Sequence, residues 1–138
     1  MASGGVVDRI AAEFGVQFVS HAKRIDGRHQ SKARRTCQTL LNKHGADHLR
    51  LVFGLINTPQ NRGNWSAPAF TAVSWVVLNK PEWVARTDFV DRFDQLDLRV
   101  LLESAKDLNP AAPTITLSVL LSYELDKQIS VEIRGKAA

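Results

Sequence analysis

The feature that most constrains this chain is an apolar run with a clear beginning and a clear end. Residues 67–78 are apolar around nearly the whole circumference of a helix. Ser66 is a typical N-cap, Pro68 suits a first helical turn, and Asn79-Lys80-Pro81 stops the run. Because a helix that is apolar on every side is usually buried, we expect a central helix here. Its main core residues are expected to be Phe70, Val73, Val76 and Val77.

Apolar residues recur at intervals of three and four on both sides of this run, which is the pattern of amphipathic helices. They predict helices over residues 7–18, 30–44, 47–57, 88–93, 98–108 and 114–129, and a helical turn at 82–84. Gly45 is expected to end one helix and to turn the chain into the next, as an αα-hairpin. We therefore expect residues 1–138 to form a single compact all-α domain of six to seven helices, with flexible ends at 1–5 and 135–138.

The composition is that of an ordinary globular domain, with 44% hydrophobic and 23% charged residues among 138. The single cysteine, Cys37, has no partner for an intramolecular disulfide, which favours a reducing compartment. The N-terminus lacks the charged and apolar segments of a secretory signal. No run approaches the ~18 consecutive apolar residues of a membrane span. We expect a cytoplasmic protein that does not associate with membranes.

The net charge of +4 conceals a division along the chain. Residues 1–62 hold ten Lys and Arg against four Asp and Glu, whereas residues 63–138 hold eight against ten. Such an asymmetry predicts one basic face, and polyanions are common partners of basic faces. The alternative is that these charges only keep the protein in solution.

The cations are most concentrated between Lys23 and Lys43, a segment in which Asp26 is the one acid. On a helix over residues 30–44, four side chains at spacings of three or four would form a row that we call the basic stripe: Lys32, Arg35, Thr39 and Lys43. Such a row suits the phosphates of a nucleic-acid backbone, with a hydroxyl to add a hydrogen bond. The predicted nucleic-acid-binding residues are Lys23, Arg24, Arg28, Lys32, Arg34, Arg35, Thr39, Lys43 and Arg62. The alternative is a solvated helix face.

Two further sequence features bear on nucleic-acid binding. In the loop of residues 61–66, Trp65 could stack on a base or anchor a partner. Alternatively, Trp65 packs as a hydrophobic staple while Arg62 caps a neighbouring helix. The helices around Gly45 also suggest a helix-turn-helix, but residues 47–57 offer few polar side chains for reading bases. Contact with phosphates is therefore the better interpretation.

Catalytic and metal-binding patterns are weak. His44 and His48 have the spacing of two zinc ligands on one helix face, but a glycine interrupts that helix and Cys37 is the only further candidate. Cys37 itself lies among apolar residues, where a cysteine is usually inert. Four carboxylates follow each other at spacings of three: Asp88, Asp91, Asp94 and Asp97. They favour a solvated acidic face over a metal site. We expect no enzyme activity, no metal and no cofactor.

One pattern resembles a known group of proteins. It comprises Asn61-Arg62-Gly63, Trp65-Ser66, Ala72-Val73-Ser74 and Pro81-Glu82-Trp83. The pattern resembles small uncharacterised helical proteins of alphaproteobacteria and their plasmids or phages, some of which are labelled partition-protein-like. The resemblance covers about residues 33–105 and supplies no catalytic residues, and Trp75 stands where the pattern is more often acidic. It implies a bacterial or mobile-element protein that acts near DNA.

These observations predict a small non-enzymatic protein whose basic N-terminal half contacts the phosphate backbone of a nucleic acid, with DNA as the expected partner. The alternative comes from another class. It is a protein-interaction module, such as a regulator, adaptor or inhibitor, whose basic surface binds an acidic protein partner.

Overall fold

The computed structural model describes residues 9–10, 27–61 and 66–137, with the side chains of 27–31 and 130–137 left outside the description. Every regular element in these segments is a helix. The helices are α3 (Gly27–His44), α4 (Ala46–Ile56), α5 (Ala67–Asn79), α6 (Pro81–Val84), α7 (Phe89–Phe93), α8 (Leu98–Leu108) and α9 (Pro113–Ala137). The all-α prediction is thus confirmed for the described segments. The helix predicted over 7–18 lies outside them, apart from Arg9 and Ile10.

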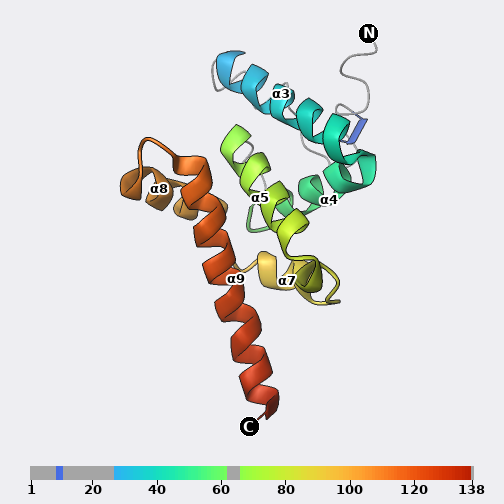
Figure 1. Ribbon diagram of the computed structural model, residues 1–138, viewed down its shortest axis with the longest axis vertical. Coiled ribbons are helices and arrows are strands. Elements are labelled where there is room, and N and C mark those ends of the chain that lie inside the picture. The colour runs from blue at the N-terminus through green and yellow to red at the C-terminus, as the bar shows by residue number, and fades with distance from the viewer. Residues whose placement is uncertain (1–8, 11–26, 62–65, 138) are drawn as a thin grey trace.

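The centre of the fold is α5, which lies between the pair α3 and α4 and the pair α8 and α9 (Figure 1). It starts as predicted, because the Ser66 hydroxyl accepts a hydrogen bond from the Ala69 amide at 3.3 Å. Phe70 is fully buried and meets Phe53 of α4 edge to face, with ring centroids 5.2 Å apart. Val73 and Val76 are also fully buried, which confirms the central helix. Val77 is only partly buried, so its prediction as a main core residue is wrong.

One side of α5 faces solvent, contrary to the expectation of a helix buried all round. Thr71, Trp75 and Leu78 are exposed at spacings of four and three, with 42% of Trp75 and 46% of Leu78 accessible. The surrounding helices α3, α4, α8 and α9 cover the other sides of α5. We call these three residues the exposed face of α5.

The hairpin of α3 and α4 turns at Gly45, as the sequence predicted. Gly45 has φ 92° and ψ 172°, and its amide donates to the Leu41 carbonyl at 2.9 Å. The Gly45 carbonyl then accepts from the Leu49 amide at 3.2 Å, which starts α4. However, α3 begins at Gly27 and not at residue 30. The predicted start of this helix is three residues too late, because no apolar residue between 27 and 32 marks a helical period.

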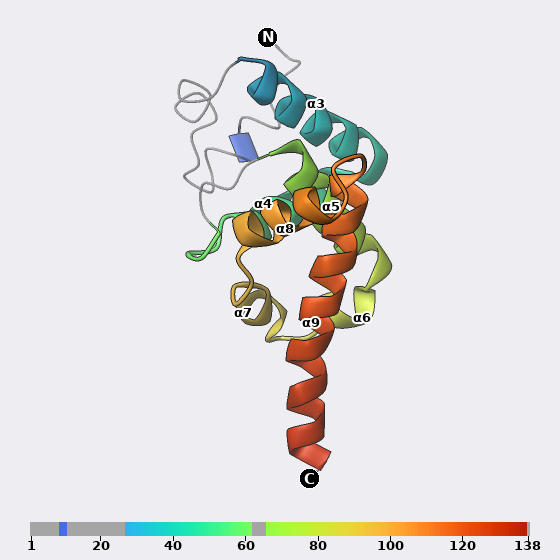
Figure 2. The same cartoon turned by 90° about the vertical axis from the view of Figure 1, so that its left-hand side faces the viewer.

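The longest helix is α9, which continues past the predicted end at Ile129 to Ala137 and projects beyond the other helices (Figures 1 and 2). After Pro113 it contains no proline or asparagine that would stop it. Leu117, Leu121 and Leu125 are fully buried on the side that meets α5, α7 and α8. None of the helices in the described segments is long and apolar enough to cross a membrane.

A buried polar joint ties the segment after α4 to the start of α8. Asn61 is fully buried, and its side-chain oxygen accepts a hydrogen bond from the Leu98 amide at 2.9 Å. Its amide group donates to the Thr58 hydroxyl at 3.3 Å. Asp97 completes the N-terminus of α8 by accepting from the Arg99 and Val100 amides. Asn61 therefore links the segment after α4 to the first turn of α8.

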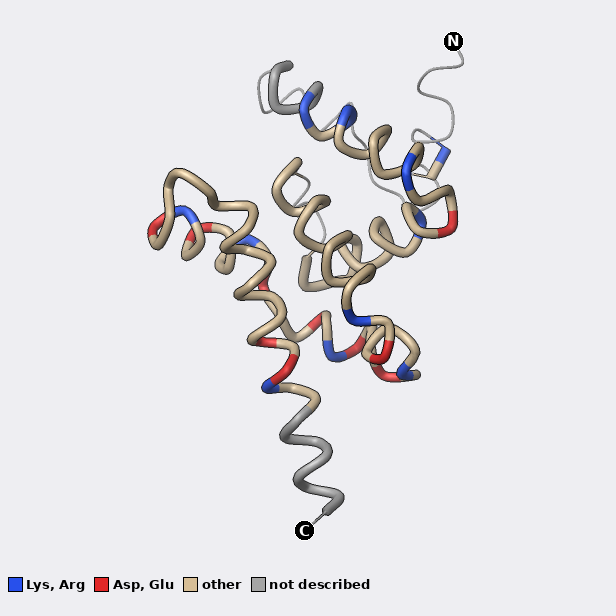
Figure 3. The backbone as a smooth tube through the Cα atoms, in the orientation of Figure 1, with Lys and Arg blue, Asp and Glu red and all other residues tan. Residues whose placement is uncertain are grey.

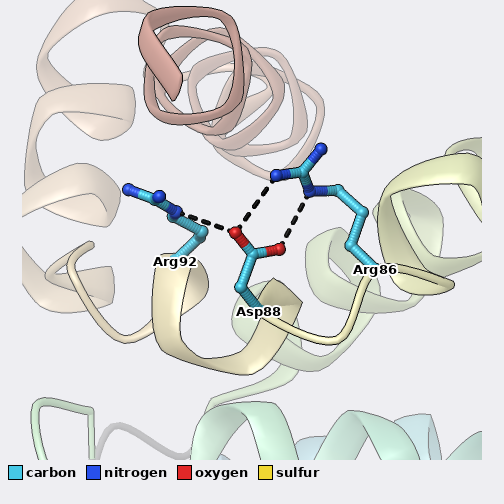
Figure 4. A network of polar contacts seen from close by, with 3 residues as sticks. All are labelled: Arg86, Asp88 and Arg92. Atoms are coloured by element: carbon cyan, nitrogen blue, oxygen red, sulfur yellow. Dashed lines mark hydrogen bonds and ion pairs between the residues drawn. The ribbon is translucent and has the colours of Figure 1, made fainter. Parts of the chain in front are cut away.

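A second polar cluster lies between α6 and α7 (Figure 4). Asp88 accepts two hydrogen bonds from Arg86, at 2.9 and 3.1 Å, and a third from Arg92 at 3.2 Å. These bonds, first from Arg86 and then from Arg92, lower the pKa of Asp88 to about 2. Asp94 accepts a hydrogen bond from the backbone amide of Gln60 at 3.0 Å. Asp88, Asp94 and Asp97 thus each accept hydrogen bonds from other groups of the protein. The described residues hold no group of three potential metal ligands.

The burial of Phe70 leads to a direct test of the core. Phe70→Ala should lower the free energy of unfolding by about 3–5 kcal/mol, because it removes a large side chain from a fully packed site. Urea denaturation measures the loss. The neighbouring change Thr71→Ala, on the exposed face of α5, should alter stability by less than about 0.5 kcal/mol. Equal stability of the two variants would contradict the core assignment.

Asn61 offers a test of the polar joint. Asn61→Ala should lower the free energy of unfolding by about 1–3 kcal/mol, because the Leu98 amide would stay buried without its acceptor. The control is Gln60→Ala, which removes an exposed side chain of the same segment together with its long, exposed hydrogen bond of 3.4 Å to Asp97, and it should have little effect. A loss no larger than that of the control would show that the joint contributes nothing.

The groove between α3 and α5

The structure places the basic stripe on the solvent side of α3. Lys32, Arg35, Thr39 and Lys43 are all exposed, while Cys37 on the opposite side is fully buried. Figure 3 shows the Lys and Arg positions along α3 and no Asp or Glu position within it, in agreement with its sequence. The geometry of the stripe is therefore as the spacing predicted, and its contact with nucleic acid stays a prediction.

The other predicted binding residues fall into two groups. Arg34 borders the stripe and is half-buried. Arg28 lies near the start of α3, with its side chain outside the described part. The remaining candidates lie outside the described residues: Lys23, Arg24, Arg62 and the possible stacking residue Trp65. The described site is consequently built on residues 32–44 of α3.

An open groove of about 420 Å³ lies between residues 35–44 of α3 and the exposed face of α5. The α3 wall consists of Arg35, Thr36, Thr39, Leu40, Lys43 and His44, and the α5 wall of Thr71, Ser74, Trp75 and Leu78. Among the described residues, no Asp or Glu lines this groove. The two walls differ in chemistry, since α3 supplies both cations, Arg35 and Lys43, whereas α5 supplies an indole and a leucine. Each wall adds two hydroxyl groups. The groove can thus contact negative charge and a flat apolar group at the same time.

Trp75 is the groove residue that sequence reasoning missed. A run that is apolar on nearly every side predicts burial on every side, and this pattern does not distinguish Trp75 from a packing residue. Thr71 was the available signal, because it lies one turn earlier on the same side of the helix. A polar residue at that position indicates a face turned to solvent.

A histidine joins the groove to α4. Ser74 is buried in the wall of the groove, and its hydroxyl lies 2.7 Å from Nε2 of His48, within hydrogen-bond distance. The ring of His44 lies 4.8 Å from that of His48. Burial, and to a lesser extent His44, lower the pKa of His48. His48 therefore favours its neutral form while it bonds to Ser74.

Cys37 is the only cysteine of the chain, and it lies in the buried side of α3. Burial raises the pKa of its thiol to about 12, although Arg34 acts weakly in the opposite direction. At neutral pH the group is thus a protonated thiol, which is neither a nucleophile nor a ready metal ligand. This agrees with its interpretation as a small packing residue.

The exposure of α4 bears on the helix-turn-helix hypothesis. Five of its residues are buried in the core: Leu49, Val52, Phe53, Leu55 and Ile56. Its exposed positions are Ala46, Asp47 and Arg50. A recognition helix needs a row of polar side chains that can reach base edges. The exposed cations of α3 are therefore better placed to contact a polyanion than the exposed residues of α4.

His48 generates a prediction about pH. Because its pKa is lower in the folded protein, the unfolded chain binds the proton more readily, and stability falls as the pH drops below about 6.5. The free energy of unfolding should be smaller near pH 5 than near pH 7.5. His48→Gln should reduce this difference, as measured by urea denaturation at both pH values. Asp88 does not interfere, since it stays ionised over this range in both states. An unchanged pH dependence in His48→Gln would contradict the assignment.

Comparison of the chain with protein-family models, with curated proteins and with solved structures gives no match. The resemblance to partition-protein-like helical proteins therefore stays a prediction from the sequence. What the described residues do establish is an all-helical fold with a groove whose one wall is basic and whose other wall is aromatic and apolar.

Proposed function

We propose that this protein is a small non-enzymatic nucleic-acid-associated protein that contacts the phosphate backbone through the basic stripe. The observation that carries the proposal is the exposure of Lys32, Arg35 and Lys43 on one side of α3, a helix that has no Asp or Glu of its own. A rigid helix keeps these cations at fixed spacings. Such an arrangement favours a partner whose negative charges are also regularly spaced.

The dimensions of the stripe suit a nucleic acid. Lys32 and Lys43 are eleven residues apart, which corresponds to about 16 Å along a helix axis. Duplex DNA carries one negative charge per ~1.7 Å of its axis, so several phosphates fall within that length. Contacts of this kind fix the position of a protein on the backbone without reading base sequence. The resemblance described above adds support for DNA and for a bacterial or mobile-element protein that works in the cytoplasm.

A protein-interaction module is the second candidate. The observation in its favour is the apolar part of the groove, formed by Leu40, Trp75 and Leu78 beside the cations of α3. An acidic amphipathic helix of a partner protein would match both surfaces. Salt would weaken either kind of complex, so the nucleic acid itself must separate the two candidates.

The test is a titration of a generic duplex at several salt concentrations. Lys32→Ala combined with Arg35→Ala should flatten the slope of log K against log salt by nearly two, because each phosphate contact contributes ~0.9. Affinity should fall about equally for unrelated sequences. The matched control is Arg99→Ala with Lys106→Ala, which removes the same charge from exposed positions of α8.

The control pair should leave the slope unchanged, and neither pair should alter the melting temperature. If both pairs change binding equally, the net charge and not the basic stripe determines affinity. If the protein at micromolar concentration and low salt binds neither duplex nor single strands, the proposal is wrong. The interaction module then takes its place.

A further inference from the structure

We infer that the groove between α3 and α5 binds single-stranded nucleic acid, with a base stacked on Trp75 and the adjoining phosphates held by Arg35 and Lys43. This inference rests on the proposed function and narrows it to one class of ligand. It also assigns a role to Trp75, a residue that lies outside the basic stripe.

Trp75 is a large aromatic residue of the central helix α5, and 42% of it is accessible to solvent. Its neighbours Val73 and Val76 are fully buried, so the backbone of α5 cannot shift freely. The amide group of Asn79 donates to the Trp75 carbonyl at 2.8 Å. A tryptophan side chain has only two torsions, and the helix fixes the backbone of Trp75. Little conformational freedom is therefore lost when a ligand stacks on its indole ring. The position is suited to a stacking platform.

The opposite wall supplies the contacts that a nucleotide strand needs besides stacking. Arg35 and Lys43 lie eight residues apart on α3, or about 12 Å along the helix axis. They can therefore hold different phosphates of one strand. The hydroxyl of Thr39 lies in the same wall and can donate to a phosphate oxygen, whereas that of Thr36 already donates to the Lys32 carbonyl at 2.9 Å. With no carboxylate among the described groove residues, nothing there opposes a polyanion.

The combination favours single strands over a duplex. In a duplex the base faces are stacked on each other, so the indole would find only the sugar-phosphate exterior. In a single strand the base faces are accessible, and aromatic side chains beside cations are the usual means of binding them. The volume of about 420 Å³ lies within the ~300–1,000 Å³ of typical ligand pockets. Since the groove is open to solvent, a strand bound there need not end inside it.

A second exposed aromatic residue provides a contrast. Tyr123 of α9 is 61% exposed, and the Lys127 ammonium lies 5.1 Å from its ring centre. That ammonium also pairs with Glu124 at 3.2 Å. An aromatic ring and a cation are thus present there too, but with a carboxylate beside them that repels phosphate. Tyr123 is therefore a matched control for Trp75.

The experiment compares three fluorescein-labelled probes of equal length by anisotropy at low salt: an oligothymidylate, an abasic strand with the same phosphates, and a duplex. The wild-type protein should bind the oligothymidylate more tightly than the abasic strand. Trp75→Leu, which keeps an apolar side chain, should weaken oligothymidylate binding at least about five-fold, the lower limit for loss of one stacked base. Binding of the abasic strand and of the duplex should be unchanged.

Two further variants identify stacking as the cause. Trp75→Phe keeps an aromatic face and should retain most of the preference for the oligothymidylate over the abasic strand. Tyr123→Leu should bind all three probes as the wild type does. Urea denaturation should show equal stability for all of these variants, because both positions are exposed.

The outcomes separate this inference from the proposed function. If Trp75→Leu binds the oligothymidylate as tightly as the wild type, or if the wild type binds the abasic strand equally well, the stacking site is wrong. The basic stripe can still contact phosphates in that case, as shown by salt-sensitive binding. If none of the three probes binds, both proposals fail, and an acidic protein segment becomes the expected occupant of the groove.

Discussion

The fold depends on the removal of one helix from water. A helix such as α5, with Phe70, Val73 and Val76 fully buried, has no stable place on the surface of a protein. Each large side chain of this kind contributes roughly 1.5–3 kcal/mol when it leaves water. The helices α3, α4 and α9 each pack an apolar side against α5, and α8 packs mainly against α9. The arrangement of the domain follows from this need for cover.

The cover is incomplete, and the groove is the result. Because α3 and α9 lie on different sides of α5, no helix covers the exposed face of α5 between them, which consists of Thr71, Trp75 and Leu78. The contact between α3 and α5 also brings Arg35, Thr39 and Lys43 of the basic stripe to the edge of the exposed face of α5. The groove is therefore produced by the packing of the core and needs no separate element to build it. A change that moves α3 on α5 would alter the groove as well.

Periodicity predicted most of the helices because their apolar sides meet a common core. It was less accurate at ends such as Gly27 and Ala137, where polar residues continue a helix without an apolar period to show it. It also could not locate the face of α5 that has no cover, because composition alone does not distinguish an exposed tryptophan from a buried one. The hydrogen bonds of Asn61 and Asp88 could not be predicted from the sequence either. Both depend on partners that the fold brings together, the Leu98 amide in one case and two arginines in the other.

The turn at Gly45 has a consequence that concerns handedness. With φ 92° and ψ 172°, its backbone occupies a region that is essentially confined to glycine. No atom lies within 4 Å of the position that an added Cβ would take, so crowding does not exclude a side chain there. The restriction is one of chirality, because the mirror image of these angles falls in the ordinary extended region. A residue of D configuration would find its preferred conformation at this turn, whereas every L residue except glycine would be strained. The angle between the helix with the basic stripe and the helix with His48 is thus fixed by an achiral residue.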